Sequence, residues 1–208
     1  MSAKLHITLV CLLLASAPAW GQYKIGIKVS PGVTYNRIST LDSTQSWGTH
    51  TGAASVVVGP VIDVSFANNY YFSTGVWFAT RQLAARPNTV AESGIRNLQV
   101  IQLPLSIKLY TDEVTLDTRL YVQMGGIAEI KIDEQMPVPQ SYVPVANLFN
   151  GSMLFGTGLE YRWGVNTLLF AGFSYQLGLF NVISYNTTAA TGYDLKNDLV
   201  SLDIGIKF

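Results

Sequence analysis

Charged side chains at every second position are the residues of this chain that most readily suggest chemistry. Glu129 is followed by Lys131, and Glu160 by Arg162, with one uncharged residue between them in each case. On a β-strand, residues two apart share a face. Such a face inside a closed sheet can line a selective pore, or it can form ion pairs that cross the interior and hold it shut.

Nucleophilic and metal chemistry have few candidates. The chain has two histidines, His6 and His50, and one cysteine, Cys11. A hydrolytic serine needs an adjacent base, and none of the strands expected below carries a histidine. One histidine beyond the leader and no thiol do not make a metal-ligand cluster. We therefore expect no catalytic residue, no metal and no cofactor, and we expect the chain not to be an enzyme.

The elements that must position the charges are β-strands. Apolar and polar residues alternate with a period of two, so that Leu103, Leu105 and Ile107 fall on one face and the residues between them on the other. A helix would scatter both sets around its circumference. The same pattern predicts eight strands, at 24–36, 55–66, 72–81, 97–110, 119–132, 149–163, 169–179 and 200–208.

Strand length and connection length both favour a membrane barrel. Several strands are about 12 residues long, whereas soluble strands average about 5–6 residues and tilted membrane strands about 9–11. Connections alternate between long (39–52, 84–96, 134–147 and 184–195) and short (67–69, 111–114 and 164–166). Outer-membrane barrels have this layout, with long loops outside and tight turns in the periplasm. It predicts that both termini are periplasmic.

The fold that follows is an all-β, eight-stranded, antiparallel up-and-down transmembrane β-barrel. In hydrocarbon an unpaired backbone N–H or C=O group costs several kcal/mol, so the first strand must pair with the last and leave no open edge. Eight strands leave an interior that side chains can fill. A soluble lipocalin-like barrel is the alternative, and recovery of the protein without detergent would favour it.

The first residues predict export. Lys4 precedes an apolar run at 7–15 that is too short to span a bilayer as a helix, and small residues follow at the spacing of a cleavage site. We expect residues 1–21 to be a signal peptide cleaved after Gly21, with cleavage after Ala19 as the alternative. Residues 22–208 then form one barrel domain.

The polar face of the expected strands carries most of the charges. We predict that ten of them form a polar network in the lumen: Lys28, Asp63, Arg81, Lys108, Arg119, Glu129, Lys131, Glu160, Arg162 and Asp203. Lys24 and Lys207 share this face, and charges close to the rims are expected to be solvated. Four aromatic residues also face inward and leave little room for a pore: Trp77, Tyr110, Tyr121 and Phe170.

Aromatic residues and prolines add local expectations. Aromatic residues near strand ends predict girdles at the two membrane interfaces: Tyr23, Tyr35, Tyr70, Tyr71, Tyr161 and Trp163. Pro60 and Pro104 each remove a hydrogen bond from the ladder, so we expect a bulge at each of them.

Several strands also carry motifs that resemble a known family. The most characteristic is QLPLSIK at 102–108, and the others are YKIGIK at 23–28, FSTGV at 72–76, LYVQMGG at 120–126 and SLDIGIKF at 201–208. With these motifs the chain resembles the PorT-like outer-membrane β-barrel family of the Bacteroidetes over essentially its whole mature length. Phe208 resembles the aromatic end that the barrel-assembly machinery reads.

The resemblance implies a function in outline. It implies a non-enzymatic structural or accessory barrel of the bacterial outer membrane, linked to type IX protein secretion or envelope assembly. The implied partners are outer-membrane lipid, the barrel-assembly machinery and secretion-system proteins. A formal net charge of +0 argues against a nucleic-acid partner. A loop-mediated binding or adhesion protein and a narrow pore are the alternatives.

Overall fold

The protein consists of long strands. The computed structural model describes residues 23–40, 47–49, 52–87, 94–136, 144–183 and 193–208, so the signal peptide expected at 1–21 and His50 lie outside the described residues. The strands are β1 (Tyr23–Thr40), β2 (Trp47–Thr49), β3 (Ala53–Ala67), β4 (Tyr70–Gly75), β5 (Trp77–Pro87), β6 (Gly94–Thr115), β7 (Thr118–Gln135), β8 (Phe149–Arg162), β9 (Leu168–Gly178) and β10 (Tyr193–Lys207). Within the described ranges, no helix is long and apolar enough to cross a membrane.

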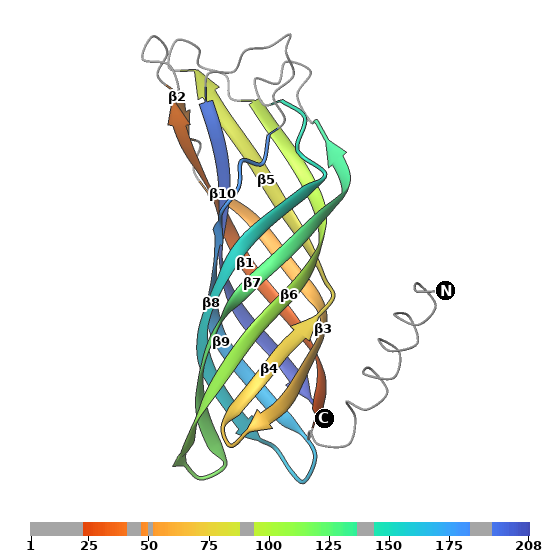
Figure 1. Ribbon diagram of the computed structural model, residues 1–208, viewed down its shortest axis with the longest axis vertical. Helices are drawn as coiled ribbons and strands as arrows, with labels where there is room; N and C mark the ends of the chain where they lie inside the picture. Colours follow the sequence, from red (N-terminus) through yellow and green to blue (C-terminus); the bar gives the residue numbers. More distant parts are fainter. Residues whose placement is uncertain (1–22, 41–46, 50–51, 88–93, 137–143, 184–192) are drawn as a thin grey trace, which may run out of the picture.

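The sheet closes on itself. β1 pairs antiparallel with β10 on one side and with β3 on the other. β4 and β5 occupy one position in the ring, because both pair with β3 and β6 and only Val76 separates them. β2 is a three-residue strand that pairs with the end of β5. The ring therefore has eight spans, and the predicted eight-stranded antiparallel barrel is confirmed (Figure 1).

The two ends of the barrel differ. The C-terminus, the start of β1 and the connections β3–β4, β6–β7 and β8–β9 lie at one end, which we call the terminal end (Figure 1). The opposite end, where β1 stops and β10 begins, we call the loop end.

A break divides β4 from β5 without a change of register. The pairing against β3 and against β6 has the same register on both sides of Val76. Pro60 of β3 and Pro104 of β6 flank the break, and proline has no N–H to donate. Side chains satisfy the two proline carbonyls: the Trp77 indole N–H donates to that of Pro60 (3.0 Å), and the Thr74 hydroxyl to that of Pro104 (2.8 Å). The expectation of bulges at the prolines was wrong.

Tight turns join strands at the terminal end. Asn69, between β3 and β4, has a φ of 66°, and Asp117, between β6 and β7, has a φ of 59°. These are left-handed conformations, which asparagine and aspartate adopt more readily than most residues. The turn expected at 111–114 is misplaced, because the ladder between β6 and β7 continues through register shifts at Glu113 and Thr115.

Apolar side chains cover the outer wall, and polar side chains face the lumen. Ile27, Leu105 and Ile204 are about half exposed on three different strands, whereas Lys28 and Ser106, one position along, are buried. This is the alternation of a membrane barrel, whose lipid-facing surface is apolar.

The alternation reverses toward the loop end. There Leu83, Leu98 and Leu195 are buried in the lumen, while Gln82 and Asn97 form an exposed hydrogen bond on the outside. The inward side chains belong to one apolar cluster: Val57, Val61, Trp77, Ala79, Leu83, Ala85, Leu98, Val100, Ile127, Ala146, Leu154, Val182, Ile183, Tyr193, Leu195 and Leu199.

This reversal explains two misplaced strand ends. β10 begins at Tyr193 rather than at residue 200, and β5 continues to Pro87 rather than stopping at 81. Both extensions place apolar side chains inside, at Leu83 and Ala85 of β5 and at Tyr193, Leu195 and Leu199 of β10, with Asn197 as an inward polar exception. A prediction based only on apolar residues at lipid-facing positions ends each strand too early and places these segments in loops.

Aromatic residues mark both borders of the apolar outer wall. Tyr23 and Trp163 are exposed near the terminal end, and Tyr35 and Tyr175 are exposed toward the loop end. Tyr71, which we expected in a girdle, is instead buried in the lumen.

Two glycines make room for a lumen tyrosine. Gly158 of β8 and Gly172 of β9 pair in register. A Cβ at Gly158 would lie 2.7 Å from the Tyr121 hydroxyl oxygen, and one at Gly172 would lie 2.6 Å from it. Each would also approach a backbone oxygen of the neighbouring strand to 2.5 Å or less. The ring of Tyr121 can fill the lumen only because both positions lack a side chain.

We predict that Gly158→Val destabilises the barrel by about 1–3 kcal/mol, because the new side chain overpacks the lumen against Tyr121. Gly126→Val is the matched control, since a Cβ at Gly126 would meet no atom within 4 Å. Urea unfolding of the detergent-solubilised protein, followed by heat-modifiable electrophoretic mobility, measures both. Equal midpoints for the two variants would show that the lumen is not tightly packed at Tyr121.

Candidate functional site

Lys207 lies at the centre of the ion pairs in the lumen. Its Nζ is 2.8 Å from a carboxylate oxygen of Asp63 and 2.6 Å from one of Glu160. β10, β3 and β8 supply these residues, and no two of those strands are neighbours, so each ion pair passes over the inner face of an intervening strand, β1 or β9. All three side chains are at most 2% exposed. A charge left alone at such a place costs several kcal/mol, so each of these residues depends on the others.

Two further lysines extend this group. Lys108 contacts both carboxylate oxygens of Asp63, at 3.1 and 3.2 Å, and Lys24 contacts Glu160 Oε1 at 2.7 Å. The Tyr110 hydroxyl donates to Glu160 Oε2 at 3.0 Å. Both carboxylates are thus shared between two lysines. The aromatic rings of three tyrosines line the lumen at this height: Tyr71, Tyr110 and Tyr121.

A separate ion pair lies nearer the loop end than the Lys207 group. Lys28 of β1 is 3.5 Å from Asp203 of β10, and its Nζ lies 3.6 Å from the centre of a Trp77 ring. An ammonium group over an indole face is attracted to it, so the tryptophan supplies part of the environment that the lysine loses on burial. The Ser174 hydroxyl donates to Asp203 at 3.1 Å.

Another buried ion pair joins Arg81 of β5 to Glu129 of β7. The Nη2–Oε1 distance is 2.5 Å, and both side chains are 3% exposed. Four neutral side chains add hydrogen bonds to the pair, although the Arg81 Nε is buried without a partner: Gln102, Ser152, Gln176 and Asn197. The apolar cluster lies on both sides of this level, with Trp77 below it and Leu83 above it toward the loop end, so the described side chains fill much of the lumen.

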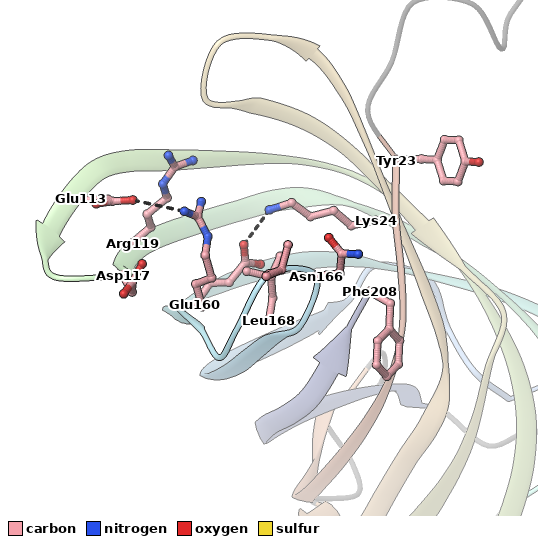
Figure 2. A pocket seen from close by; sticks show the side chains of 11 residues that line it. Tyr23, Lys24, Glu113, Asp117, Arg119, Glu160, Asn166, Leu168 and Phe208 are labelled. Carbon is pink, nitrogen blue, oxygen red and sulfur yellow. Dashed lines mark hydrogen bonds and ion pairs between the residues drawn. The ribbon is translucent and has the colours of Figure 1, made fainter.

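At the terminal end the lumen opens into a cavity of about 630 Å³. Figure 2 shows Lys24 of β1 reaching across toward Glu160, and this ion pair lies at the inner end of the cavity. Both oxygens of Glu160 are already bonded, as described above. Tyr23, Leu168 and Phe208 add apolar surface to the wall. The cavity is therefore closed at its inner end by residues that have their partners.

Two arginines line this cavity with spare hydrogen-bonding capacity. Arg162 is 4.0 Å from Glu113, and both side chains are close to half exposed. Arg119 lies opposite Glu113 and Glu160 in the register of its two neighbouring strands. It nevertheless makes no ion pair or side-chain hydrogen bond within the described ranges, and its Nε is buried without a partner. A guanidinium in this state can bind an added carboxylate.

The ten residues predicted for a lumen network lie in three places. Seven form the buried ion pairs: Lys28, Asp63, Arg81, Lys108, Glu129, Glu160 and Asp203. Arg119 and Arg162 line the terminal-end cavity. Lys131 lies toward the loop end, where it pairs with Glu134.

Lys24 and Lys207 are the residues that the sequence interpretation left out. The sequence places both lysines on the polar face. Charges close to the rims of the barrel are expected to be solvated, and both lysines lie near the chain ends. Lys207 instead pairs with Gly26 in the register of β1 and β10, and it lies deep enough to contact Asp63 and Glu160. The stagger between strands decides this depth, and no local pattern in the sequence reports it.

Metal and hydrolytic chemistry have no visible centre in the described ranges. No group of three or more histidine, cysteine, aspartate or glutamate side chains there could hold a metal ion. His50, the remaining candidate base, lies outside those ranges.

The closed barrel, with its apolar wall and polar lumen, agrees with a comparison to known families. Residues 20–184 match the model of the outer membrane protein beta-barrel domain. The chain belongs to this family. The protein is therefore a β-barrel of the bacterial outer membrane, as the sequence predicted. Comparison with curated protein sequences found no match.

Solved structures share the fold at low sequence identity. The chain is similar to the outer membrane protein OprG from Pseudomonas aeruginosa, with a TM-score of 0.62 and 13% identity over 90% of this chain and 96% of that one. It is also similar to Neisserial surface protein A, with a TM-score of 0.51 and 15% identity over 88% of this chain and 97% of that one. At such identity the likeness concerns the fold alone.

We predict that Lys207→Met lowers the free energy of unfolding by about 3 kcal/mol, because it removes one partner from each of two buried carboxylates. Arg162→Gln is the control. Its ion pair with Glu113 is long and exposed, and we expect a loss below about 1 kcal/mol. Denaturant unfolding in detergent micelles measures both values. Losses of equal size would mean that the buried ion pairs contribute no more than a surface pair.

Proposed function

We propose that this protein is a non-enzymatic accessory barrel that serves type IX protein secretion or envelope assembly, as a PorT-like member of the family in the Bacteroidetes. The motifs at 102–108 and 120–126 support the PorT-like assignment. The observation that carries the accessory role is the filled lumen.

The filled lumen argues against solute passage. Porins conduct through a water-filled interior. Here Lys207 with its two carboxylates, the Arg81–Glu129 pair and the apolar cluster occupy successive levels of the described barrel. A barrel filled in this way acts through its ends and its outer wall.

The cavity at the terminal end is the better candidate for contact with a partner. It is closed at its inner end, so it can receive a group but cannot pass one on. Arg119 and Arg162 provide guanidinium groups that match a carboxylate, and Tyr23 and Phe208 provide apolar surface beside them. This combination suits an acidic segment of a partner protein, with apolar residues next to the carboxylate.

We further propose that the terminal end faces the periplasm. Tight turns at 68–69 and 116–117 support this orientation, because barrels of this class keep short turns on the periplasmic side. The partner of the cavity is then a periplasmic protein or the periplasmic part of a secretion component.

Single-cysteine labelling tests the orientation. Cys11 is the only cysteine of the sequence and lies in the predicted signal peptide, so a new cysteine gives a single reporter. Gln135→Cys, at the loop end, should react with a membrane-impermeant maleimide on intact cells, and Leu116→Cys, in the β6–β7 turn, should react only after lysis. The reverse labelling pattern would reverse the orientation.

Partner capture tests the accessory role. We predict that the double variant Arg119→Gln, Arg162→Gln captures at least tenfold less of the partner that cross-links to wild-type protein in detergent-solubilised outer membrane. The reason is that the partner's carboxylate loses both guanidinium groups. Lys196→Gln, an outer-wall change near the loop end, is the control and should retain the partner. Equal capture by all three proteins would remove the cavity from the proposal.

Planar-bilayer recording tests the accessory role against the pore. The wild-type protein should show no porin-like conductance steps. Steady conductance that changes with Arg81→Ala would favour the narrow pore instead.

Binding through the loop end is a second candidate. It is favoured by the polar outer surface of β5 and β6 beyond the apolar wall, where a cavity of about 370 Å³ is lined by polar residues that include Thr80, Gln82, Asn97, Gln99 and Gln135. Gln82→Ala with Asn97→Ala should weaken adhesion to a surface if this candidate holds, and should leave the cross-linked partner unchanged.

A further inference from the structure

A carboxylate faces outward on β10, where the outward positions that follow it toward the terminal end are apolar. Asp198 is the next outward-facing position from the exposed Val200 toward the loop end, yet its side chain is only 5% exposed. Four donors saturate it: Arg37 Nε at 2.6 Å and Nη2 at 2.9 Å, the Tyr175 hydroxyl at 3.0 Å and the Gly178 N–H at 2.9 Å. A carboxylate with this many bonds has no capacity for a ligand, so its effect is to hold Arg37 in place.

Arg37 keeps two free donors in this arrangement. A guanidinium has five N–H groups. Its Nε–H and one Nη2–H bind Asp198, and the other Nη2–H donates to the Gly178 carbonyl at 2.8 Å. The two Nη1–H groups have no partner among the described residues, and the side chain is 46% exposed. Because the group is already fixed, binding an anion there loses little side-chain entropy.

A second cation lies directly across the ladder. Lys196 of β10 is the register partner of Arg37 on β1, and the two share the outer face. Like charges in this position repel each other, and Asp198 supplies a single negative charge for the two cations. Lys196 makes no ion pair within the described residues, and Asp194 on the same face bonds to Asn181. The cluster of Arg37, Lys196 and Asp198 therefore has one positive charge in excess.

The cluster lies at the border of the lipid-facing wall. Tyr35 and Tyr175 are the next outward positions toward the membrane centre, and Val33 and Val200 continue the apolar surface. Tyrosine is enriched where a bilayer meets water. A lipid whose acyl chains lie along this wall would place its headgroup at Arg37 and Lys196.

We propose that Arg37 and Lys196 bind the phosphate of a lipid headgroup in the leaflet at the loop end, with Asp198 as the positioning residue. Guanidinium and ammonium groups form charge-assisted hydrogen bonds to phosphate oxygens. The position on the outer wall selects a lipid phosphate over a free one, because the anion is held beside surface that only acyl chains cover. This inference is independent of the accessory role.

Native mass spectrometry of the detergent-solubilised full-length barrel tests this site, with lipid A and dephosphorylated lipid A as probes. Wild-type protein should bind lipid A at least fivefold more tightly than the dephosphorylated form. Lys196→Gln should reduce this preference about fivefold, the factor expected for one cation near a lipid surface. Asp198→Asn should reduce it as well, because Arg37 is no longer held, and Lys196→Arg should retain it.

Leu116→Glu is the charge-matched control. It changes the net charge by one unit at an 86% exposed position of the terminal end, so it should keep the wild-type preference. Equal affinity of wild type for both lipids would overturn the proposal, as would an equal loss in Leu116→Glu and Lys196→Gln. Inorganic phosphate that displaces lipid A at equal concentration would assign the site to a free anion. Heat-modifiable mobility confirms folding of each variant.

Discussion

Pairing of every backbone N–H and C=O group within hydrocarbon is the constraint on which the rest of this structure depends. β1 meets it by pairing with both β10 and β3, which leaves the ring without an edge. The same constraint explains the break beside Val76. Two prolines interrupt the ladder there, and Trp77 and Thr74 bond the proline carbonyls in place of the backbone. Closure at eight spans also sets a lumen narrow enough for side chains to fill.

The narrow lumen imposes a second constraint. Charges that face it must be paired, and Lys207 illustrates how: it serves two carboxylates from strands that never touch each other. The ion pairs of Lys207 tie together strands that do not pair with each other, whereas the apolar cluster resembles the core of a soluble protein. The polarity of the barrel thus reverses along its length.

The two borders of the apolar wall show different chemistry. At the terminal end, Arg119 and Arg162 line a cavity that is closed only at its inner end, and both have bonding capacity to spare. Near the loop end, Arg37 is held on the outer wall by Asp198, and its remaining donors face outward. The first arrangement suits a carboxylate of a partner protein, and the second suits a lipid phosphate. Both use arginine because its planar, permanently charged group can be fixed on one side and still bind on another.

Local alternation of apolar and polar residues is enough to predict the class of fold and the face on which most residues lie. Strict alternation is a local property, so Lys28, Asp63 and Trp77 could be assigned to the lumen without coordinates. The rule that apolar residues face the lipid fails at Tyr193, because the polarity of the barrel reverses there and apolar residues point inward. The depth of Lys207 and the isolation of Arg119 are instead properties of the folded barrel. Both depend on the stagger between strands far apart in the chain, which sets the height at which side chains meet across the lumen.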